Sequence, residues 1–316
     1  MKLNKAQNMM LGIAIGDAFG LGYEFIHGGR EEVAKQFDFT KYRANPNEGW
    51  GHSTPGLYSD DTQMSIAVAE LLISNDEFTK ENLADKFVKC YKRDPINGYA
   101  RRFQDFLNGV TTSEEFLTKI NPISKRNGAA MRSVPIGVIN NLEQLKKYAK
   151  INAEVTHNTP EGISSAVVTA LASHKYYYGI EKNIFDFVIE SGKENLDSIT
   201  IYFLRCLKEM NELNPEALFG KKNKELGVPC DGMRTAGAVL YLLNKHKSSK
   251  EILKEAVLLG GDTDSTASIA LGINAIKYGL EDLPEFLMQD LTNHKYGREY
   301  LIELGNNLEE KLFSHI

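Results

Sequence analysis

The sequence predicts an all-α protein, and three observations carry that prediction. Apolar residues recur at helical spacing in one segment after another. No segment alternates apolar and polar residues between hairpin turn signals, as half-buried strands do. No polar linker or solenoid-length repeat divides the chain, so we expect residues 1–316 to form one helical domain.

The first helix is expected at residues 5–21, where large apolar residues mix with glycine and alanine, a composition typical of a helix packed closely on others. Residues 26–58 are rich in glycine, proline and aromatic residues and are predicted to form a long loop, which in compact domains tends to be functional. Within it, Trp50 and Tyr58 suit either stacking on a base or covering the core.

Further helices follow from the spacing of the apolar residues. Pro160 is expected in the first turn of one of them, and Pro135 is expected to kink or end another. The predicted segments are 62–75, 81–94, 97–109, 127–139, 158–179, 196–210, 231–245, 249–261, 265–279 and 297–312.

Composition excludes several classes of protein. Of the 316 residues, 42% are hydrophobic and 25% charged, and no tract of 18 apolar residues predicts a membrane span. The net charge of −5, without a basic block, argues against binding to nucleic acid.

Cys90, Cys206 and Cys230 are too few and too scattered for a disulfide framework or a zinc knuckle. A short apolar stretch near the start is similar to a signal peptide, but Asp17 interrupts it, so we expect a cytoplasmic protein. We also expect a monomer.

Two aspartates, Asp262 and Asp264, stand in the segment LGGDTDSTASIA between an apolar run and an apolar helix. Burying an ionised carboxylate is costly unless it is paired, capped or bound to a metal. Because residues two apart lie about 200° around a helix, both are expected in a loop. Asp264 alone would suit an N-cap. An EF-hand is excluded, since Ala267 and Ile273 occupy the positions that require glycine and glutamate.

The same pattern occurs about two hundred residues earlier, in YSDDTQM. Ser59, Asp60, Asp61 and Thr62 again precede an apolar helix, although a cap needs only one aspartate. Oxygen donors without histidine or cysteine suit hard cations such as Mg²⁺ or Mn²⁺. Four clustered carboxylates repel one another, and two cations would neutralise them, so the sequence predicts a dinuclear site.

A third acidic segment, GDAFGLGYE, ends the first helix and adds Asp17 and Glu24. Asp17 follows a glycine in a buried helix, so we expect it to accept hydrogen bonds from neighbouring backbone or hydroxyl groups. Glu24 is the candidate for a residue that alternates between a metal and the substrate, with a solvated surface glutamate as the ordinary alternative.

In their order, these motifs resemble those of the ADP-ribosylglycohydrolases, the dinitrogenase-reductase-activating glycohydrolase family. GIAIGDAFGLGYE resembles its first-helix motif, YSDDTQM its Ser/Thr-Asp-Asp-Thr motif, and GGDTDST its Gly-Gly-Asp-x-Asp-Ser/Thr motif. The resemblance implies a compact orthogonal helical domain with Glu24, Asp61 and Asp264 as catalytic residues. The metal ligands it implies are Ser59, Asp60, Asp61, Asp262, Asp264 and Ser265.

Two further segments resemble parts of the family's ADP-ribose site: RNGAAMRSVPIG and THNTPEG. The first begins a candidate helix, whose N–H groups suit a pyrophosphate. Met131 and Arg132 also suit a core position and a structural salt bridge, and His157 suits packing as well as a ligand. Arg126 and Ser265 depart from the glycine and threonine frequent in the family. The implied substrate contacts are Asn127, Gly128, Ala129, Met131 and His157.

The resemblance implies an enzyme that hydrolyses the glycosidic bond between ADP-ribose and a modified side chain, with arginine first and serine second. Its cofactors would be two divalent cations, Mg²⁺ or Mn²⁺, and its partners ADP-ribose and an ADP-ribosylated protein. Two alternatives stay open. A silent ADP-ribose-binding protein is disfavoured because every aspartate of both motifs is present. A hydrolase of another ADP-ribosyl or phosphate-containing molecule, such as a metal-dependent phosphatase, would differ in its product.

Overall fold

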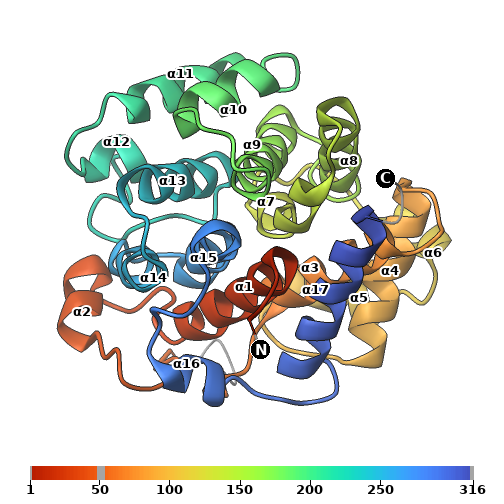
Figure 1. Cartoon of the computed structure of the whole chain (residues 1–316), viewed down its shortest axis with the longest axis horizontal. Coiled ribbons are helices and arrows are strands. Elements are labelled where there is room, and N and C mark those ends of the chain that lie inside the picture. The colour runs from red at the N-terminus through yellow and green to blue at the C-terminus, as the bar shows by residue number, and fades with distance from the viewer. Residues whose placement is uncertain (1, 48–53, 314–316) are drawn as a thin grey trace.

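The computed structural model describes residues 2–47 and 54–313. Within these ranges the regular elements are helices, and the only β-pairing among them is two isolated bridges. The all-α prediction is therefore confirmed (Figure 1). They are α1 (Lys5–Leu21), α2 (Gly29–Gln36), α3 (Asp60–Ile73), α4 (Lys80–Arg93), α5 (Arg101–Asn108), α6 (Ser113–Lys119), α7 (Gly128–Met131), the 3₁₀ helix η2 (Val134–Val138), α8 (Leu142–Glu154), α9 (Pro160–Tyr177), α10 (Ile184–Gly192), α11 (Ser198–Lys208), α12 (Pro215–Phe219), α13 (Gly232–Lys245), α14 (Ser249–Leu258), α15 (Thr263–Tyr278), α16 (Glu285–Gln289) and α17 (Arg298–Phe313).

Two predictions need correction, and several helices were not predicted. The expected loop 26–58 contains α2, which buries only Gly29 and Val33 and therefore has no apolar period to detect. The expected helix 127–139 is two short pieces, because Pro135 lies in the 3₁₀ helix η2. The sequence reading also missed α6, α8, α10, α12 and α16.

Helices α1 and α15 form the centre of the molecule and lie side by side (Figure 1). Their backbones approach so closely that a side chain at Gly16 would put its Cβ 2.4 Å from the carbonyl oxygen of Ala267. At Gly20 the corresponding distance, to the oxygen of Thr263, is also 2.4 Å. Glycine is required at both positions because no real Cβ tolerates such contacts. The pair brings the end of α1 to the start of α15, where the acidic motifs lie.

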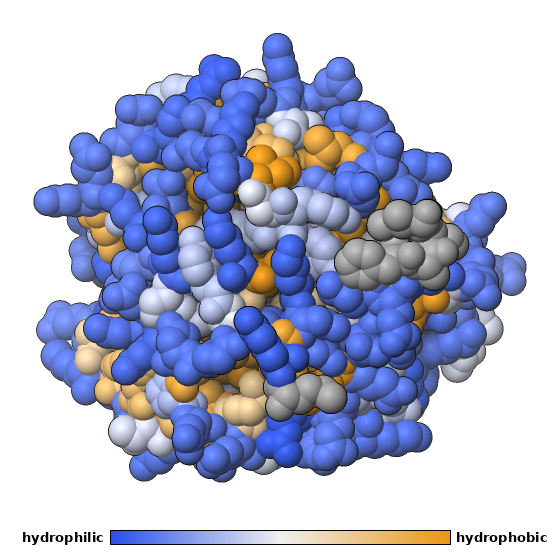
Figure 2. Space-filling view, in the orientation of Figure 1, coloured by the Kyte–Doolittle hydropathy of each residue, from blue (hydrophilic) through white to orange (hydrophobic). Residues whose placement is uncertain are grey.

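The face in Figure 2 is mostly hydrophilic, with hydrophobic side chains in small separate groups. Apolar side chains lie mainly inside, where one extended core includes nearly every apolar residue of α1 and α15. Among the described helices, none is both long and apolar enough to cross a membrane.

Candidate active site

Glu24 lies three residues beyond the end of α1 and is 5% exposed. Phe25, the next residue, has a φ of 45°, a conformation that is costly for a residue with a side chain. Its N–H donates to the carbonyl of Gly261 at 2.8 Å, and the Asn45 amide donates to the carbonyl of Glu24 at 2.9 Å. These contacts hold Glu24 against the loop that carries the aspartates.

Asp262 and Asp264 lie at the start of α15, where one prediction proves wrong. Asp262 is the N-cap residue, and Asp264 lies in the first helical turn instead of in a loop or at the cap. Gly260 and Gly261, with φ values of 68° and 75°, turn the chain sharply before it. Because Asp262 precedes the regular helix, the separation of about 200° expected for two helical residues does not apply, and both carboxylates reach the same place.

The start of α3 is fixed by Asp17, which is fully buried in α1. Its carboxylate accepts hydrogen bonds from the Ser59 hydroxyl at 2.7 Å and the Thr62 hydroxyl at 2.6 Å, and from the backbone N–H of both residues. This confirms the structural role expected of Asp17. Ser59, not Asp60 or Asp61, is the N-cap residue of α3, so neither aspartate has its carboxylate at the capping position.

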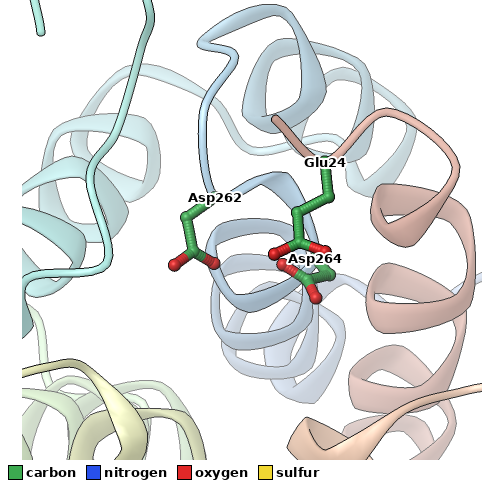
Figure 3. Close-up of side chains that lie close together, drawn as sticks. All are labelled: Glu24, Asp262 and Asp264. Carbon is green, nitrogen blue, oxygen red and sulfur yellow. The ribbon is translucent and has the colours of Figure 1, made fainter. Parts of the chain in front are cut away.

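These elements build a buried acidic centre (Figure 3). Glu24, Asp262 and Asp264 each offer a carboxylate oxygen within 4.8 Å of the other two. Asp61 is joined to the group by the Ser265 hydroxyl, which donates to Asp61 Oδ2 at 3.2 Å. The other oxygen, Asp61 Oδ1, is buried without a hydrogen-bond partner among the described residues. An oxygen-only donor set with an unpartnered carboxylate oxygen fits a hard divalent cation.

Burial is the first cause that raises pKa values throughout this centre. It raises the pKa of Glu24, Asp61 and Asp264 well above the ordinary range, with neighbouring carboxylates adding to the effect. Asp60 is partly exposed as a residue, but burial of its carboxyl group, and then the charge of Asp17, raises its pKa to about 7. In the described part of the chain, none of these acids forms an ion pair with a lysine, arginine or histidine. The centre therefore carries carboxylates that the protein itself does not neutralise.

Asn127 contacts the acidic centre, and His157 lies beside Gly128, the residue after Asn127. The Asn127 amide donates to Asp262 Oδ2 at 3.1 Å and to the Thr235 hydroxyl at 3.2 Å. His157 Nδ1 lies 2.6 Å from the Thr156 hydroxyl, which itself accepts a hydrogen bond from Arg132. The hydroxyl oxygen has two lone pairs, so the contact with Nδ1 is compatible with either tautomer of the ring. Burial lowers the pKa of His157 to about 3, which keeps the ring neutral.

A family model described as ADP-ribosylglycohydrolase matches residues 1–315 of the chain. The chain belongs to the ADP-ribosylglycohydrolase family. It is therefore related to hydrolases that cleave the glycosidic bond of ADP-ribose, and the resemblance of its motifs is confirmed.

Relatives and a solved structure agree with this family over nearly full length. ADP-ribosylhydrolase ARH3 of Xenopus tropicalis is 26% identical, over 89% of each chain. The ADP-ribosyl-[dinitrogen reductase] glycohydrolase of Rhodospirillum rubrum is 25% identical, over 89% of this chain and 88% of its own. A solved ADP-ribosylglycohydrolase-related protein complex superimposes with a TM-score of 0.72 at 20% identity, covering 98% of both chains, which supports the fold.

Not every expected substrate residue of this ADP-ribosylglycohydrolase faces the acidic centre. Ala129 is fully buried in a small cluster with Ala153 and Ala166, and Met131 is 6% exposed in the main core. The α7 helix that they belong to has only four residues, so its N-terminal dipole is weak. Gly128 packs on the ring of His157, since a Cβ there would lie 2.8 Å from Cε1.

Arg132 forms no salt bridge with the residues that the structure describes, contrary to the expectation. Its guanidinium donates to the Asn152 side chain at 2.6 Å and to the Thr156 hydroxyl at 2.7 Å, both neutral groups. It also lies over the ring of Phe87, 4.6 Å from the centroid. Burial lowers its pKa to about 9. Arg132 is thus a structural residue that fixes Thr156, and through Thr156 the ring of His157.

A cavity of about 410 Å³ lies beside the start of α3. Leu21, Leu57 and Ile96 give it apolar walls, and Asp94 and His294 give it a polar side. It adjoins the acidic centre through its lining residue Gly98, where a Cβ would lie 3.0 Å from Asp60 Oδ1.

Two aromatic residues of the predicted loop have different outcomes. Tyr58 lines this cavity at 2% exposure, and its hydroxyl donates to the carbonyl of Tyr296 at 2.9 Å. This favours a structural role over stacking on a base. Trp50 lies outside the described residues.

Sequence reasoning missed one residue of the acidic centre, Cys230. The N–H of Asp262 donates to the carbonyl of Val228, two residues before Cys230, at 2.8 Å, so Cys230 lies near this end of α15. Burial, and then the charge of Asp262, raises the pKa of this thiol. The signal was a cysteine directly before Asp231, the N-cap residue of α13, but a lone cysteine carries no spacing pattern that would single it out.

Proposed function

We propose that this chain is a metal-dependent ADP-ribosylhydrolase that releases ADP-ribose from a modified protein side chain, with two Mg²⁺ or Mn²⁺ ions as cofactors. The observation that carries the proposal is the buried group Glu24, Asp262 and Asp264, together with the unpartnered Asp61 Oδ1. A protein substrate is supported by the Rhodospirillum rubrum relative, whose name is that of a glycohydrolase of ADP-ribosylated dinitrogen reductase. We propose further that the enzyme is monomeric and cytoplasmic.

The residues divide into metal ligands and substrate contacts. Ser59, Asp60, Asp61, Asp262, Asp264 and Ser265 are the proposed metal ligands. Bound cations would neutralise these carboxylates, orient the ribose hydroxyls and lower the pKa of a water molecule. Backbone contacts hold Glu24 in a loop beyond the end of α1. Because these contacts fix the backbone only, we propose that the Glu24 side chain moves between metal and substrate.

On the substrate side, Asn127 orients Asp262 by a hydrogen bond. Neutral His157 packs against Gly128 with its Nδ1 engaged by Thr156, and its Nε2 is the ring nitrogen offered to a ribose hydroxyl. Burial of the centre excludes water and strengthens the electrostatic stabilisation of the positive charge that develops on the ribose ring.

Arginine remains the favoured linkage, and the cavity beside α3 supports it. Apolar walls suit an aliphatic stem, and the Asp94 carboxylate, whose hydrogen-bond partner is His294 at 3.1 Å, suits a guanidinium. Serine, the second choice, has no charged group to match Asp94. We expect Asp94→Asn to lower kcat/KM for an arginine-linked peptide by roughly tenfold, the value of a hydrogen bond to a charged group, and to spare a serine-linked one.

The test is a mass-spectrometric assay on peptides ADP-ribosylated at arginine or at serine, with Mg²⁺ or Mn²⁺ and with a chelated control. Release of intact ADP-ribose that chelation abolishes is the expected result. Release of inorganic phosphate instead would indicate a phosphatase. Binding of ADP-ribose without any release would indicate a silent binding protein.

A further inference from the structure

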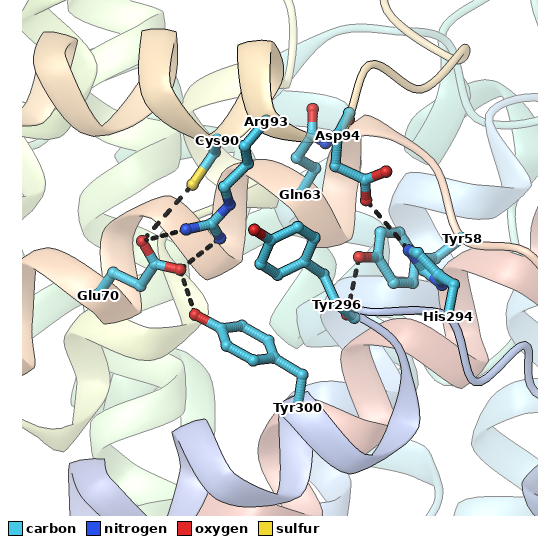
Figure 4. A network of polar contacts seen from close by, with 9 residues as sticks. All are labelled: Tyr58, Gln63, Glu70, Cys90, Arg93, Asp94, His294, Tyr296 and Tyr300. Atoms are coloured by element: carbon cyan, nitrogen blue, oxygen red, sulfur yellow. Dashed lines mark hydrogen bonds and ion pairs between the residues drawn. The ribbon is translucent and has the colours of Figure 1, made fainter.

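The polar side of the cavity beside α3 is formed by two residues from distant parts of the chain (Figure 4). Asp94 is the C-cap residue of α4, and His294 lies in the loop between α16 and α17. His294 Nε2 lies 3.1 Å from Asp94 Oδ2, and the two side chains are 26% and 25% exposed. The pair is therefore accessible to a group that enters the cavity.

The loop that carries His294 is fixed at several points. The N–H of Thr292 donates to the carbonyl of Gly56 at 2.8 Å, and the N–H of Gly297 donates to the carbonyl of His294 at 2.9 Å. The imidazole ring packs on the ring of Tyr58, with 5.3 Å between the two centroids. These contacts hold the imidazole in one orientation beside the cavity.

Asp94 is tied to the helix that begins at the acidic centre. Its backbone carbonyl accepts a hydrogen bond from the Gln63 side chain at 2.6 Å, and Gln63 accepts one from the Tyr99 hydroxyl at 2.7 Å. Gln63 lies on α3, two residues after Asp61. The place of Asp94 relative to the acidic centre is therefore set by the helix that carries the aspartates of that centre.

The contact between the two side chains determines the charge that the cavity presents. An ionised carboxylate only accepts hydrogen bonds, so Nε2 of His294 is the donor. The other ring nitrogen, Nδ1, is buried and has no hydrogen-bond partner among the described residues. A charged ring would leave an N–H donor unsatisfied there, which costs more than an unpaired neutral nitrogen. His294 therefore orients the carboxylate of Asp94 without neutralising it.

We propose that His294 is a positioning residue for the leaving group: it holds the Asp94 carboxylate in the orientation that receives the guanidinium of an ADP-ribosylated arginine. This inference rests on the proposed function. Oδ1 of Asp94 accepts no hydrogen bond from a described residue and stays available to the guanidinium. Without a donor at position 294, the carboxylate would lose the contact that fixes its orientation, and arginine-linked substrates would bind less tightly.

The test compares KM and kcat of two variants on a peptide ADP-ribosylated at arginine, with Mn²⁺. His294→Leu removes the donor and should raise KM by roughly fivefold with little change in kcat, since it weakens substrate binding. His294→Gln, whose amide N–H takes the place of Nε2, should restore most of the affinity. His246→Leu is the matched control, because His246 is 27% exposed and also lies near a carboxylate. An unchanged KM in His294→Leu, or a His294→Gln variant that is equally impaired, would overturn the proposal.

A second measurement uses the wild type and so does not depend on how the variants fold. Ethylguanidine, which has the head group of arginine without ADP-ribose, is titrated into the protein while the proton NMR signals of the histidine rings are followed. The signal of His294 should shift saturably, and that of His246 should stay constant. Equal shifts of both, or of neither, contradict the inference.

Hydrolysis of the arginine-linked peptide by the wild type is measured separately. Release of ADP-ribose without a shift of His294 refutes only this inference. A shift of His294 without any release refutes the proposed hydrolysis of arginine linkages and leaves the guanidinium site in place.

Discussion

The half-buried carboxylate of Glu70 and the buried carboxylates of the acidic centre are treated in opposite ways. Glu70 of α3 is saturated by the protein: it pairs with the Arg93 guanidinium and accepts hydrogen bonds from Tyr300 and Cys90 (Figure 4). Arg93 also lies over the ring of Tyr296, 4.1 Å from its centroid. The acidic centre, in contrast, gathers Glu24, Asp262 and Asp264 with no lysine or arginine paired to them among the described residues.

The difference distinguishes a structural carboxylate from the carboxylates proposed to bind metal. Glu70 ties α3 to α4 and α17 and has its charge compensated within the fold. The carboxylates of the acidic centre are compensated only when a cation comes from solution or when they take up protons, as their raised pKa values indicate. Replacing residues in one group should therefore change stability, and in the other group function.

The largest expected effect is on turnover. Asp264→Asn should lower kcat by about a hundredfold or more, because it removes a proposed metal ligand. It should not lower the Tm of the metal-free protein, since it removes an uncompensated buried charge. Steady-state kinetics with Mn²⁺, and thermal melts with and without it, measure both. Asp76→Asn, an exposed aspartate, is the matched control. Near-wild-type turnover of Asp264→Asn at limiting metal would contradict the proposal that Asp264 is a metal ligand.

The converse change should affect stability first. Glu70→Ala should reduce the free energy of unfolding by about 2 kcal/mol, because Arg93 and Tyr300 then lose their charged partner in a partly exposed network. Chemical denaturation measures this loss. At low temperature the variant should keep its stabilisation by Mn²⁺, and a loss of that stabilisation would show that the two groups are coupled. Glu70→Gln, which keeps the shape and removes the charge, separates packing from ion pairing.

A third expectation concerns pH. Asp60 has a pKa of about 7 in the folded protein against an ordinary 3.8, so its protonated form contributes stability at acid pH that is lost as the pH rises toward 7. The Tm of the metal-free protein should fall by roughly 5 °C between pH 5 and pH 8, at about 2 °C per kcal/mol. Saturating Mn²⁺ should remove most of this fall. A Tm that rises over this range would mean that the carboxylates are already paired.

The smallest effect is expected at Asn127. Asn127→Ala removes the hydrogen bond to Asp262 and leaves the carboxylate in place, so metal affinity should fall by roughly tenfold. Isothermal titration with Mn²⁺ measures it. Asn82→Ala, with its side chain on the exposed part of α4, serves as the control. An unchanged affinity for Mn²⁺ would mean that Asn127 contributes to substrate binding and not to metal binding.

Much of the fold and the composition of the site were predictable from local sequence. Helical periodicity, and the absence of hairpin signals, are properties of short segments, and they led to the correct fold class. Asp262 and Asp264 stand between apolar segments, which indicated that their charges would need a partner in the folded protein. Both are indeed buried in the acidic centre. Pro160 at the first helical position was predictable for the same local reason.

The geometry depended on contacts that no segment reveals alone. Glu24 meets the aspartates because Gly16 and Gly20 let the backbones of α1 and α15 touch. Cys230 joins the centre through backbone pairing with the loop before α15, some thirty residues further along the chain. Helix α2 went unnoticed because it buries too little to impose an apolar period. These are tertiary effects that override local pattern.

The central claim is that the acidic centre of this ADP-ribosylglycohydrolase lacks an internal counter-charge and binds cations in its place. Mn²⁺ binding to the metal-free protein, followed by electron paramagnetic resonance at increasing Mn²⁺ concentration, tests it most directly. We predict saturable loss of the free-ion signal with two Mn²⁺ per chain, and weakened binding in Asp264→Asn. No bound Mn²⁺ at saturating concentration, or binding that Asp264→Asn leaves unchanged, would contradict it.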